Sequence, residues 1–361
     1  MVIGIDASKL NAVNPTGVEI ATKELIRALL KLDRSNIYWL YSPTPLTLEW
    51  TNFENVKNIV VPAKKLWTLW TLSREIKKRP PEIFWSPSNF LPYNLPKKSV
   101  ATICDLAFHL FPRSYSLKAR ALSYFTLNRA IKSTSKLIAI SQQTKKDLKR
   151  YFKVPGENIE VVYLGVRQDL NHNEFDFAVT YPNLDKYFIY VGRLELRKNL
   201  PNIIKAFHQF IATADAPVKL VLCGSRGFGY STIKNLVKKL KLEDKVIFLG
   251  YVDASHLPAL YQKSLGVIFA SQYEGFGLNI LEGFASNVPV LTSNFGAMAE
   301  IAGGAALLVD PNHVDEIAES YLELYQNQNL RQVLIEKGQV RLQDFSWEKA
   351  AEKLMEIWKN L

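Results

Sequence analysis

A glycine-rich run flanked by two glutamates carries the strongest chemical signal in the sequence. Within SQYEGFGLNILEGFASNVPVLTS, Gly275 and Gly277 separate a buried strand pattern from a helical one. Glycines let a ligand approach the backbone closely, and the free N–H groups at a helix start favour an anion such as a diphosphate. Glu274 precedes this turn, and Glu282 lies about one turn into the helix, where it can accept hydrogen bonds from a ribose diol. The alternative is a plain strand–turn–helix with two surface glutamates.

A cationic loop forms the second candidate site. In VGRLELRKN, Gly192 ends a predicted strand, and Arg193 and Lys198 follow at a spacing that can place two cations over one anion. An arginine fork and a lysine point charge can neutralise a diphosphate without a metal. No Asp-x-Asp motif follows a predicted strand, so we expect no metal and no cofactor. The alternative is a solvated loop.

Apolar runs of strand length alternate with helical patterns along the chain, which predicts a parallel α/β fold. The first series of predicted strands covers residues 2–6, 37–41, 58–61, 82–85, 99–103, 136–140 and 159–162, with helices at 18–32 and 117–132 among them. The second series has strands at 187–191, 218–223, 245–248, 266–269 and 288–291, and helices at 199–213, 230–240, 256–263, 278–286 and 313–326.

The two series predict two Rossmann-like domains. We expect an N-terminal domain over 1–170, a polar linker over 171–186 and a C-terminal domain over 187–345. A last amphipathic helix, capped by Ser346, spans 346–361 and is expected to cross back to the first domain. Two such domains would face each other across a cleft at the carboxyl ends of their strands.

These motifs resemble those of retaining glycosyltransferase family 4, which has the GT-B fold. The resemblance rests on the spacing Glu274-x7-Glu282, on residues 250–264 and on AGGAALLVDP at 302–311. In the first half it is patchier, reaching the opening IGIDAS, the SPSN segment and CDLAFHLFP. It implies a hexose, of the mannose or glucose type, transferred from a GDP- or UDP-sugar to a glycan or lipid-linked acceptor with retention at the anomeric carbon.

The resemblance also assigns roles to residues. It implies that Arg193 and Lys198 hold the donor pyrophosphate, that Glu274 orients the sugar and that Glu282 holds the ribose. The remaining expected donor-binding residues are Gly17, Gly192, Gly224, Tyr251, Gly275, Phe276, Gly277 and Leu278.

One segment of the first half departs from the family pattern. Many members carry His-Asp where this chain has Cys104 followed by Asp105, and the histidine contacts the sugar near the reaction centre. Asp105 fits the pattern as a catalytic residue. His109 lies nearby, although a histidine among phenylalanines is more often structural, and Asn89 could line the acceptor entrance. The substitution leaves a catalytically degenerate nucleotide-sugar-binding protein as an alternative.

The net charge of +11 lies entirely within residues 1–180. Such asymmetry favours a negatively charged partner. Leu66, Trp67 and Trp70 lie among basic residues, which is typical of peripheral contact with an anionic membrane. These are Lys64, Lys65, Arg74, Lys77, Lys78 and Arg79, with Lys145, Lys146, Lys149, Arg150 and Lys153 as an extension. Solvated helices with inward-packed tryptophans are the alternative.

Other classes of protein are disfavoured. Two cysteines give no disulfide framework, no apolar run is long enough to span a bilayer and no signal-peptide pattern opens the sequence. We therefore expect a cytoplasmic protein, and the basic first half adds the expectation of contact with the inner face of the membrane. The glycines at 224, 227 and 229 do not match the G-x-G-x-x-G of an NAD-dependent enzyme. No nucleic-acid reader motif is present, and no nucleic-acid partner is expected.

Overall fold

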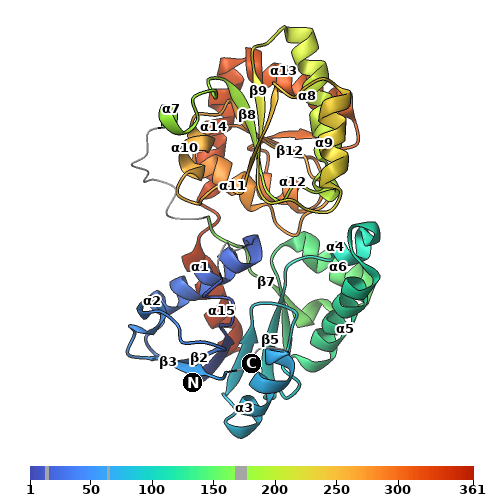
Figure 1. The fold of residues 1–361 in the computed structure, drawn as a ribbon. Coiled ribbons are helices and arrows are strands. Elements are labelled where there is room, and N and C mark those ends of the chain that lie inside the picture. The colour runs from blue at the N-terminus through green and yellow to red at the C-terminus, as the bar shows by residue number, and fades with distance from the viewer. Residues whose placement is uncertain (13–15, 63–65, 167–176) are drawn as a thin grey trace. The chain divides into compact units, whose positions relative to one another are not determined.

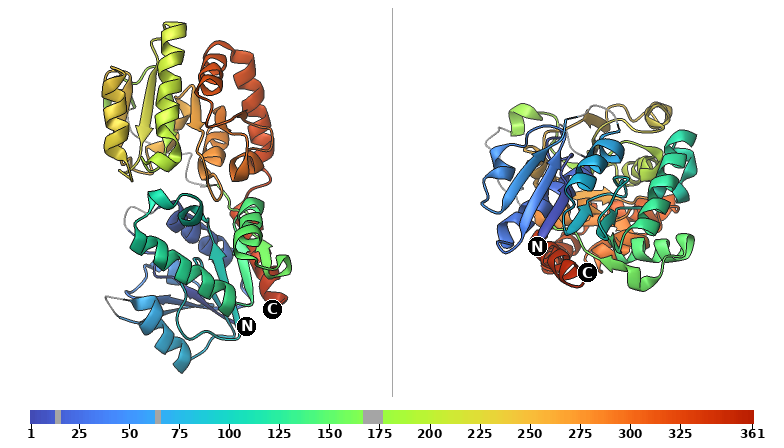
Figure 2. Two further views of the ribbon diagram at one scale, coloured as in Figure 1. Left: turned by 90° about the vertical axis from the view of Figure 1, so that its right-hand side faces the viewer. Right: turned by 90° about the horizontal axis from the view of Figure 1, so that it is seen from below.

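The computed structural model describes residues 1–12, 16–62, 66–166 and 177–361, and these form two compact units (Figure 1). The first unit comprises Met1–Pro112, Ser116–Gly165 and Phe345–Leu361, and the second comprises Arg113–Tyr115 and Val166–Asp344. Each unit has one parallel sheet with helices on its faces (Figure 2). The predicted α/β class with two Rossmann-like units is confirmed.

The sheet of the first unit has the strand order β3-β2-β1-β4-β5-β6-β7. Its strands are β1 (Val2–Asp6), β2 (Ile37–Ser42), β3 (Val56–Val60), β4 (Ile83–Ser86), β5 (Lys98–Ile103), β6 (Lys136–Ala139) and β7 (Ile159–Val161). All neighbours pair in parallel, and the central strands are apolar and buried because helices cover both faces. The order reverses between β1 and β4.

The helices of the first unit connect these strands. They are α1 (Gly17–Leu32), α2 (Leu48–Thr51), η1 (Trp67–Leu72), α3 (Ser73–Lys78), α4 (Ala107–Leu110), α5 (Leu117–Ser133), α6 (Gln142–Phe152) and the short η2 (Pro112–Ser114) and η3 (Gly156–Asn158). The element η1 is a π-helix, a form that the sequence pattern did not predict.

The sheet of the second unit has the order β10-β9-β8-β11-β12-β13, which reverses between β8 and β11. Its strands are β8 (Tyr187–Val191), β9 (Lys219–Cys223), β10 (Val246–Gly250), β11 (Gly266–Phe269), β12 (Val290–Ser293) and β13 (Leu307–Val309). Its helices are α7 (Phe177–Thr180), η4 (Leu196–Lys198), α8 (Leu200–Ala214), α9 (Tyr230–Lys239), α10 (Leu257–Gln262), α11 (Leu278–Ala285), α12 (Gly296–Ala302), α13 (Val314–Gln326) and α14 (Gln328–Leu342).

The C-terminal helix α15 (Trp347–Lys359) belongs to the first unit, as predicted. The Ser346 hydroxyl accepts a hydrogen bond from the Lys349 amide at 3.1 Å and caps the helix. On its apolar face, the ring of Trp358 lies 6.2 Å from that of Tyr38 and 6.3 Å from that of Trp85, and the helix packs against α1. The ordered aromatic contacts explain why the helix returns to this unit.

Several elements of the second unit are not among the predicted ones. They include the short helices α7 and α12, strand β13 and helix α14, whose sequence has little apolar periodicity. Arg341 fixes α14 by donating to the carbonyl oxygens of Ile301 and Glu300 at the end of α12. The predicted linker ends inside this unit, since residues 177–186 include α7, while residues 171–176 lie outside the described part of the chain.

Candidate active site

The strand order of the second unit brings two distant loops together. Strands β8 and β11 are neighbours, with Gly266 paired to Phe188 and Val267 paired to Ile189. The chain leaves both strands at the same edge of the sheet, at the point where the order reverses. Open α/β sheets bind ligands at such a point. The cationic loop after β8 and the glycine-rich turn after β11 therefore meet.

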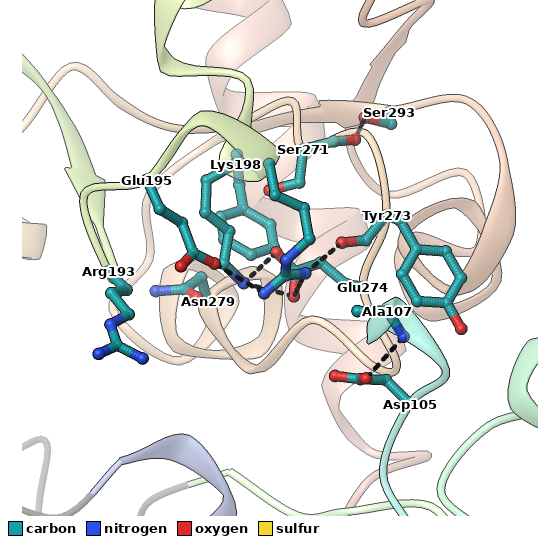
Figure 3. A network of polar contacts seen from close by, with 12 residues as sticks. Asp105, Ala107, Arg193, Glu195, Lys198, Ser271, Tyr273, Glu274, Asn279 and Ser293 are labelled. Atoms are coloured by element: carbon teal, nitrogen blue, oxygen red, sulfur yellow. Dashed lines mark hydrogen bonds and ion pairs between the residues drawn. The ribbon is translucent and has the colours of Figure 1, made fainter. Parts of the chain in front are cut away.

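Lys198 and Glu274 form the centre of this site (Figure 3). The Lys198 ammonium lies 2.5 Å from Oε1 and 2.7 Å from Oε2 of the Glu274 carboxylate. The side chains are only 13% and 11% exposed. The pair unites the two motifs that the sequence identified separately, residues 76 positions apart.

Arg197 is a second cation at Glu274, which the sequence pattern did not indicate. Its guanidinium donates to the Tyr273 carbonyl oxygen at 2.9 Å and to Glu195 Oε1 at 2.8 Å, and lies 3.8 Å from Glu274 Oε2. The side chain is 9% exposed. The available signal was the Arg-Lys pair in LRKN, whose first member must point inward when the short helix η4 forms.

These charges set the ionisation of Glu274. Burial by itself raises the pKa of this carboxyl, but the charges of Lys198 and Arg197 and the hydrogen bond from Lys198 outweigh burial and bring the pKa below its usual value. Glu274 is therefore a carboxylate at neutral pH and can accept hydrogen bonds, but cannot donate one.

Arg193 lies elsewhere on the same loop. It is exposed, and Figure 3 shows its guanidinium directed away from Lys198 and Glu274. The reason is backbone pairing: the Leu194 amide donates to the Ser225 carbonyl at 2.9 Å, which holds the chain extended and buries Leu194. The cation that shares Glu274 with Lys198 is Arg197, whereas the sequence spacing had paired Lys198 with Arg193.

Glycines make the close approach of neighbouring loops possible. Gly192 and Gly224 follow β8 and β9 with φ of +146° and +139°. A Cβ on Gly224 would lie 2.0 Å from the Gly192 carbonyl oxygen. Gly277, with φ of +119°, precedes Leu278 at the start of α11. Positive φ favours glycine at all of these positions.

Glu282 is buried on α11 beside a tyrosine. The Tyr261 hydroxyl donates to Glu282 Oε2 at 2.7 Å, and burial together with the Glu282 charge raises the pKa of Tyr261 far above its usual value. Asn279 Nδ2 lies 3.2 Å from the same hydroxyl and 2.8 Å from the Val191 carbonyl. Tyr261 and Asn279 thus position Glu282 relative to the end of β8, which the sequence did not indicate.

The other predicted donor-binding residues of this unit lie around the same sheet edge. Gly275 and Phe276 belong to the turn between Glu274 and α11, with Phe276 4% exposed. Tyr251 follows β10 and is 52% exposed. Asn199, which follows Lys198, ties the loop after β8 to the ends of two other segments, because its side-chain amide donates to the carbonyl oxygens of Ala270 and Pro311.

The remaining predicted residues belong to the first unit and follow its strands. Gly17 opens α1, where Thr16 and Glu19 form a capping box. The Asp105 carboxylate accepts a 2.9 Å hydrogen bond from the Ala107 amide (Figure 3). Asn89 donates to the Thr126 hydroxyl at 3.1 Å.

Two residues near Asp105 have structural surroundings. Burial, with a smaller effect from the Asp105 charge, raises the pKa of Cys104 to about 12, so its thiol stays protonated. His109 Nδ1 lies 2.6 Å from the Tyr124 hydroxyl, and its ring contacts Tyr151 and Phe152. This aromatic cluster agrees with the structural alternative for His109.

Solved structures share the fold along the whole chain. Sucrose-phosphate synthase from Thermosynechococcus elongatus superposes with a TM-score of 0.78 at 19% identity over 99% of this chain and 98% of its own. WaaG, a glycosyltransferase involved in lipopolysaccharide biosynthesis, gives a TM-score of 0.74 at 15% identity over 99% of each chain. The fold is therefore that of the GT-B glycosyltransferases.

Sequence comparisons identify the family. The glycosyltransferase family 4 profile matches residues 15–170, and the profile of glycosyl transferases group 1 matches residues 172–341. The O-antigen chain mannosyltransferase B of Escherichia coli is 28% identical over 77% of this chain and 74% of its own. The O-antigen chain mannosyltransferase RfbU of Salmonella typhimurium is 28% identical over 60% of this chain and 58% of its own. The chain belongs to glycosyltransferase family 4 and is a glycosyltransferase. This assignment sets aside the NAD-dependent alternative.

Among the described residues, no helix combines the length and the apolarity that crossing a bilayer requires.

Proposed function

We propose that this protein is a retaining hexosyltransferase that transfers mannose from a nucleotide-sugar donor to a glycan or lipid-linked acceptor without a metal ion. The proposed donor is GDP-mannose, in preference to a UDP-sugar. The observation that carries the proposal is the contact of Lys198 with Glu274 at the switch point of the second sheet. The preference for mannose is supported by the similarity to two O-antigen chain mannosyltransferases.

The donor diphosphate would sit at this sheet edge. Lys198 would move from Glu274 to the leaving diphosphate, and Arg193, exposed on the same loop, would close onto it from solvent. Cations aimed at a leaving group stabilise the charge that develops as its bond breaks. Glu274 and the backbone of residues 275–278 would orient the sugar hydroxyls, and Glu282 would bind the ribose.

The transfer step retains the anomeric configuration. The acceptor hydroxyl oxygen attacks the anomeric carbon from the face that the diphosphate leaves, so the new C–O bond replaces the bond to the phosphate oxygen. The hydroxyl proton passes to that phosphate oxygen, and the nucleoside diphosphate departs with the electron pair. The chain supplies positioning and charge stabilisation in this scheme.

A panel of nucleotide sugars tests the proposal. GDP-mannose, UDP-glucose, UDP-galactose and NAD are titrated against the protein in thermal-shift experiments with EDTA present, and slow donor hydrolysis is followed for each. We expect GDP-mannose to stabilise the protein most and to be hydrolysed with release of α-mannose. Binding without any hydrolysis or transfer would instead support a catalytically degenerate donor-binding protein, and a metal requirement would contradict metal independence.

We also propose that the first unit contacts an anionic membrane that displays the acceptor. The apolar part of the surface consists of Leu66, Trp70 and Tyr93, which are 59%, 54% and 65% exposed. Trp70 stacks on Tyr93 with ring centroids 6.1 Å apart. The guanidinium carbon of Arg129 lies 5.1 Å from the centroid of the Tyr93 ring. Exposed basic residues follow on the same helical stretch: Arg74, Lys77 and Lys78.

Trp67, which the sequence placed in this contact, is not part of the proposed surface. Trp67 is 8% exposed, and its indole N–H donates to the Val61 carbonyl at 2.6 Å, so this tryptophan belongs to the core. Lys145 likewise bonds the Ile159 carbonyl, while Lys64 and Lys65 lie outside the described residues. Aromatic rings beside basic side chains suit the interface of an anionic bilayer.

Vesicle sedimentation tests the membrane contact. The protein should sediment with vesicles containing phosphatidylglycerol and remain in solution with phosphatidylcholine alone. Trp70→Ala should weaken sedimentation several-fold, while Trp67→Phe, at a core position, serves as the matched aromatic control. Equal sedimentation with both vesicle types, or no effect of Trp70→Ala, would contradict the proposed surface.

A further inference from the structure

Four charged side chains with little exposed surface lie at the turn that carries Glu274. Lys198 and Arg197 supply two positive charges, and Glu195 and Glu274 supply two negative ones. The side chains are between 9% and 13% exposed. The four side chains therefore balance one another electrically, and taking away one cation leaves one carboxylate in excess.

The proposed function takes away such a cation. When Lys198 turns to the leaving diphosphate, Glu274 loses the two hydrogen bonds that this ammonium donates. A buried carboxylate without a partner is costly, and it either becomes protonated or moves. Either change would spoil a group that must accept hydrogen bonds from the sugar.

Arg197 is placed to prevent both changes. It is anchored independently of Lys198, since its guanidinium bonds the Tyr273 carbonyl and Glu195 while facing Glu274 at 3.8 Å. The bond to Tyr273 fixes the residue directly before Glu274. A guanidinium also keeps its charge at every relevant pH.

We propose that Arg197 is a positioning residue that remains the counter-ion of Glu274 and holds its turn in place when Lys198 engages the diphosphate. This inference rests on the proposed function. Arg197 itself need not touch the donor, because its hydrogen bonds are directed at the protein.

The ionisable groups around Glu274 allow a pH test. In the second unit these are Lys198, Arg197 and Glu195 from the loop after β8, and Tyr190 within β8, whose hydroxyl donates to the Arg193 carbonyl. Tyr190 is buried, and its pKa lies well above the usual value, so it stays neutral. Loss of Arg197 should therefore raise the pKa of Glu274. The acid limb of the pH profile of kcat should then move to higher pH.

The experiment compares Arg197→Met, Arg197→Lys and Lys205→Met. Lys205→Met is the matched control, because it removes an exposed cation from α8, the helix that follows the same loop. Each variant is assayed for donor hydrolysis or transfer between pH 4.5 and 9 and for binding of GDP and UDP. For Arg197→Met we expect kcat to fall roughly 10–100-fold and the acid limb to rise by about one pH unit. Binding of the sugar-free nucleotide should change less than twofold.

Arg197→Lys should restore the acid limb but only part of kcat, since an ammonium cannot span Tyr273, Glu195 and Glu274 at once. A lower Tm with an unchanged acid limb in Arg197→Met would reduce Arg197 to a structural residue and overturn the inference. If the wild-type chain binds and turns over no nucleotide sugar, the proposed function fails first, which separates the two outcomes.

Discussion

The ammonium of Lys198 donates to both carboxylate oxygens of Glu274, at 2.5 and 2.7 Å, across 76 residues of sequence. In the proposed reaction, each of these side chains exchanges the other for a group of the donor. We expect Lys198→Ala and Glu274→Ala each to lower transfer at least about 100-fold. The double variant should be about as impaired as either single one, because the two residues act as a unit.

The measurement is kcat/KM for the best donor, with Tm and circular dichroism showing that the variants are folded. Removing one partner of a buried pair costs up to about 3–5 kcal/mol, so assays are run well below the Tm of each variant. Turnover at the wild-type rate in either single variant would contradict the assigned roles.

Substitutions of Glu282 and Tyr261 should weaken nucleotide binding to different extents. Glu282→Gln keeps the shape but removes the carboxylate that is proposed to accept from the ribose, so the Kd for GDP or UDP should rise about tenfold, at about 1.4 kcal/mol per tenfold change. Tyr261→Phe removes only the hydroxyl that positions Glu282, bonded at 2.7 Å, and should raise Kd less. Calorimetric titration measures both, and an equal or larger effect of Tyr261→Phe would assign the ribose contact to the tyrosine.

Gly224 predicts a steric effect distinct from backbone strain. A methyl group at this position would lie 2.0 Å from the Gly192 carbonyl oxygen, whereas Gly250, which also has positive φ, has open space around its Cβ position. Gly224→Ala should therefore lower the Tm clearly more than Gly250→Ala, whose cost is limited to about 1 kcal/mol of backbone strain. Similar Tm values for the two variants in thermal unfolding would count against the tight contact between the loops.

Asp33 predicts a pH-dependent contribution to stability. Burial alone would raise its pKa, but hydrogen bonds from Tyr38, Asn36 and Ser35 outweigh it and lower the pKa to about 2. The pKa of an aspartate in an unfolded chain is about 4. The ionised Asp33 therefore stabilises the fold fully above that pH, and this stabilisation is lost as the pH falls toward 2. Asp33→Asn should lower the Tm by a few degrees at pH 7 and by less at pH 3.

Thermal melts at the two pH values measure this difference. Glu54→Gln is the control, because Glu54 is an exposed carboxyl shortly before β3 in the same unit. A Tm difference between Asp33→Asn and wild type that is constant with pH would show that the hydrogen bonds do not depend on the ionised form.

Cys104 predicts a variant without effect on the pH profile. Its thiol stays protonated because burial raises its pKa to about 12. Cys104→Ser should therefore keep the pH profile of kcat between pH 6 and 9. Cys104→His should add an ionisation at about pH 6.5 to this profile. Initial rates across this range provide the measurement, and an altered profile in Cys104→Ser would show that the thiolate takes part.

Much of the architecture follows from local sequence. Most strands and helices could be predicted because buried parallel strands are short apolar runs and the helices between them are amphipathic, as in Leu200–Ala214. The elements that the sequence did not predict include β13, which has three residues, α12, which has seven, and α14, whose polar sequence forms a helix against α11 and α13. Such elements are stabilised by packing that a local pattern does not record.

The sequence by itself also identified the two loops that are proposed to carry the chemistry, because Lys198 and Glu274 lie in glycine-containing segments directly after strands. Only the tertiary structure decided which neighbouring side chains face the site. Arg197 points inward and Arg193 outward because residue 194 pairs with the loop after β9, and Trp67 is buried while Trp70 is exposed because the π-helix sets their directions. The direction of a side chain depends on long-range hydrogen bonds and packing, whereas the residue type and spacing are fixed along the chain.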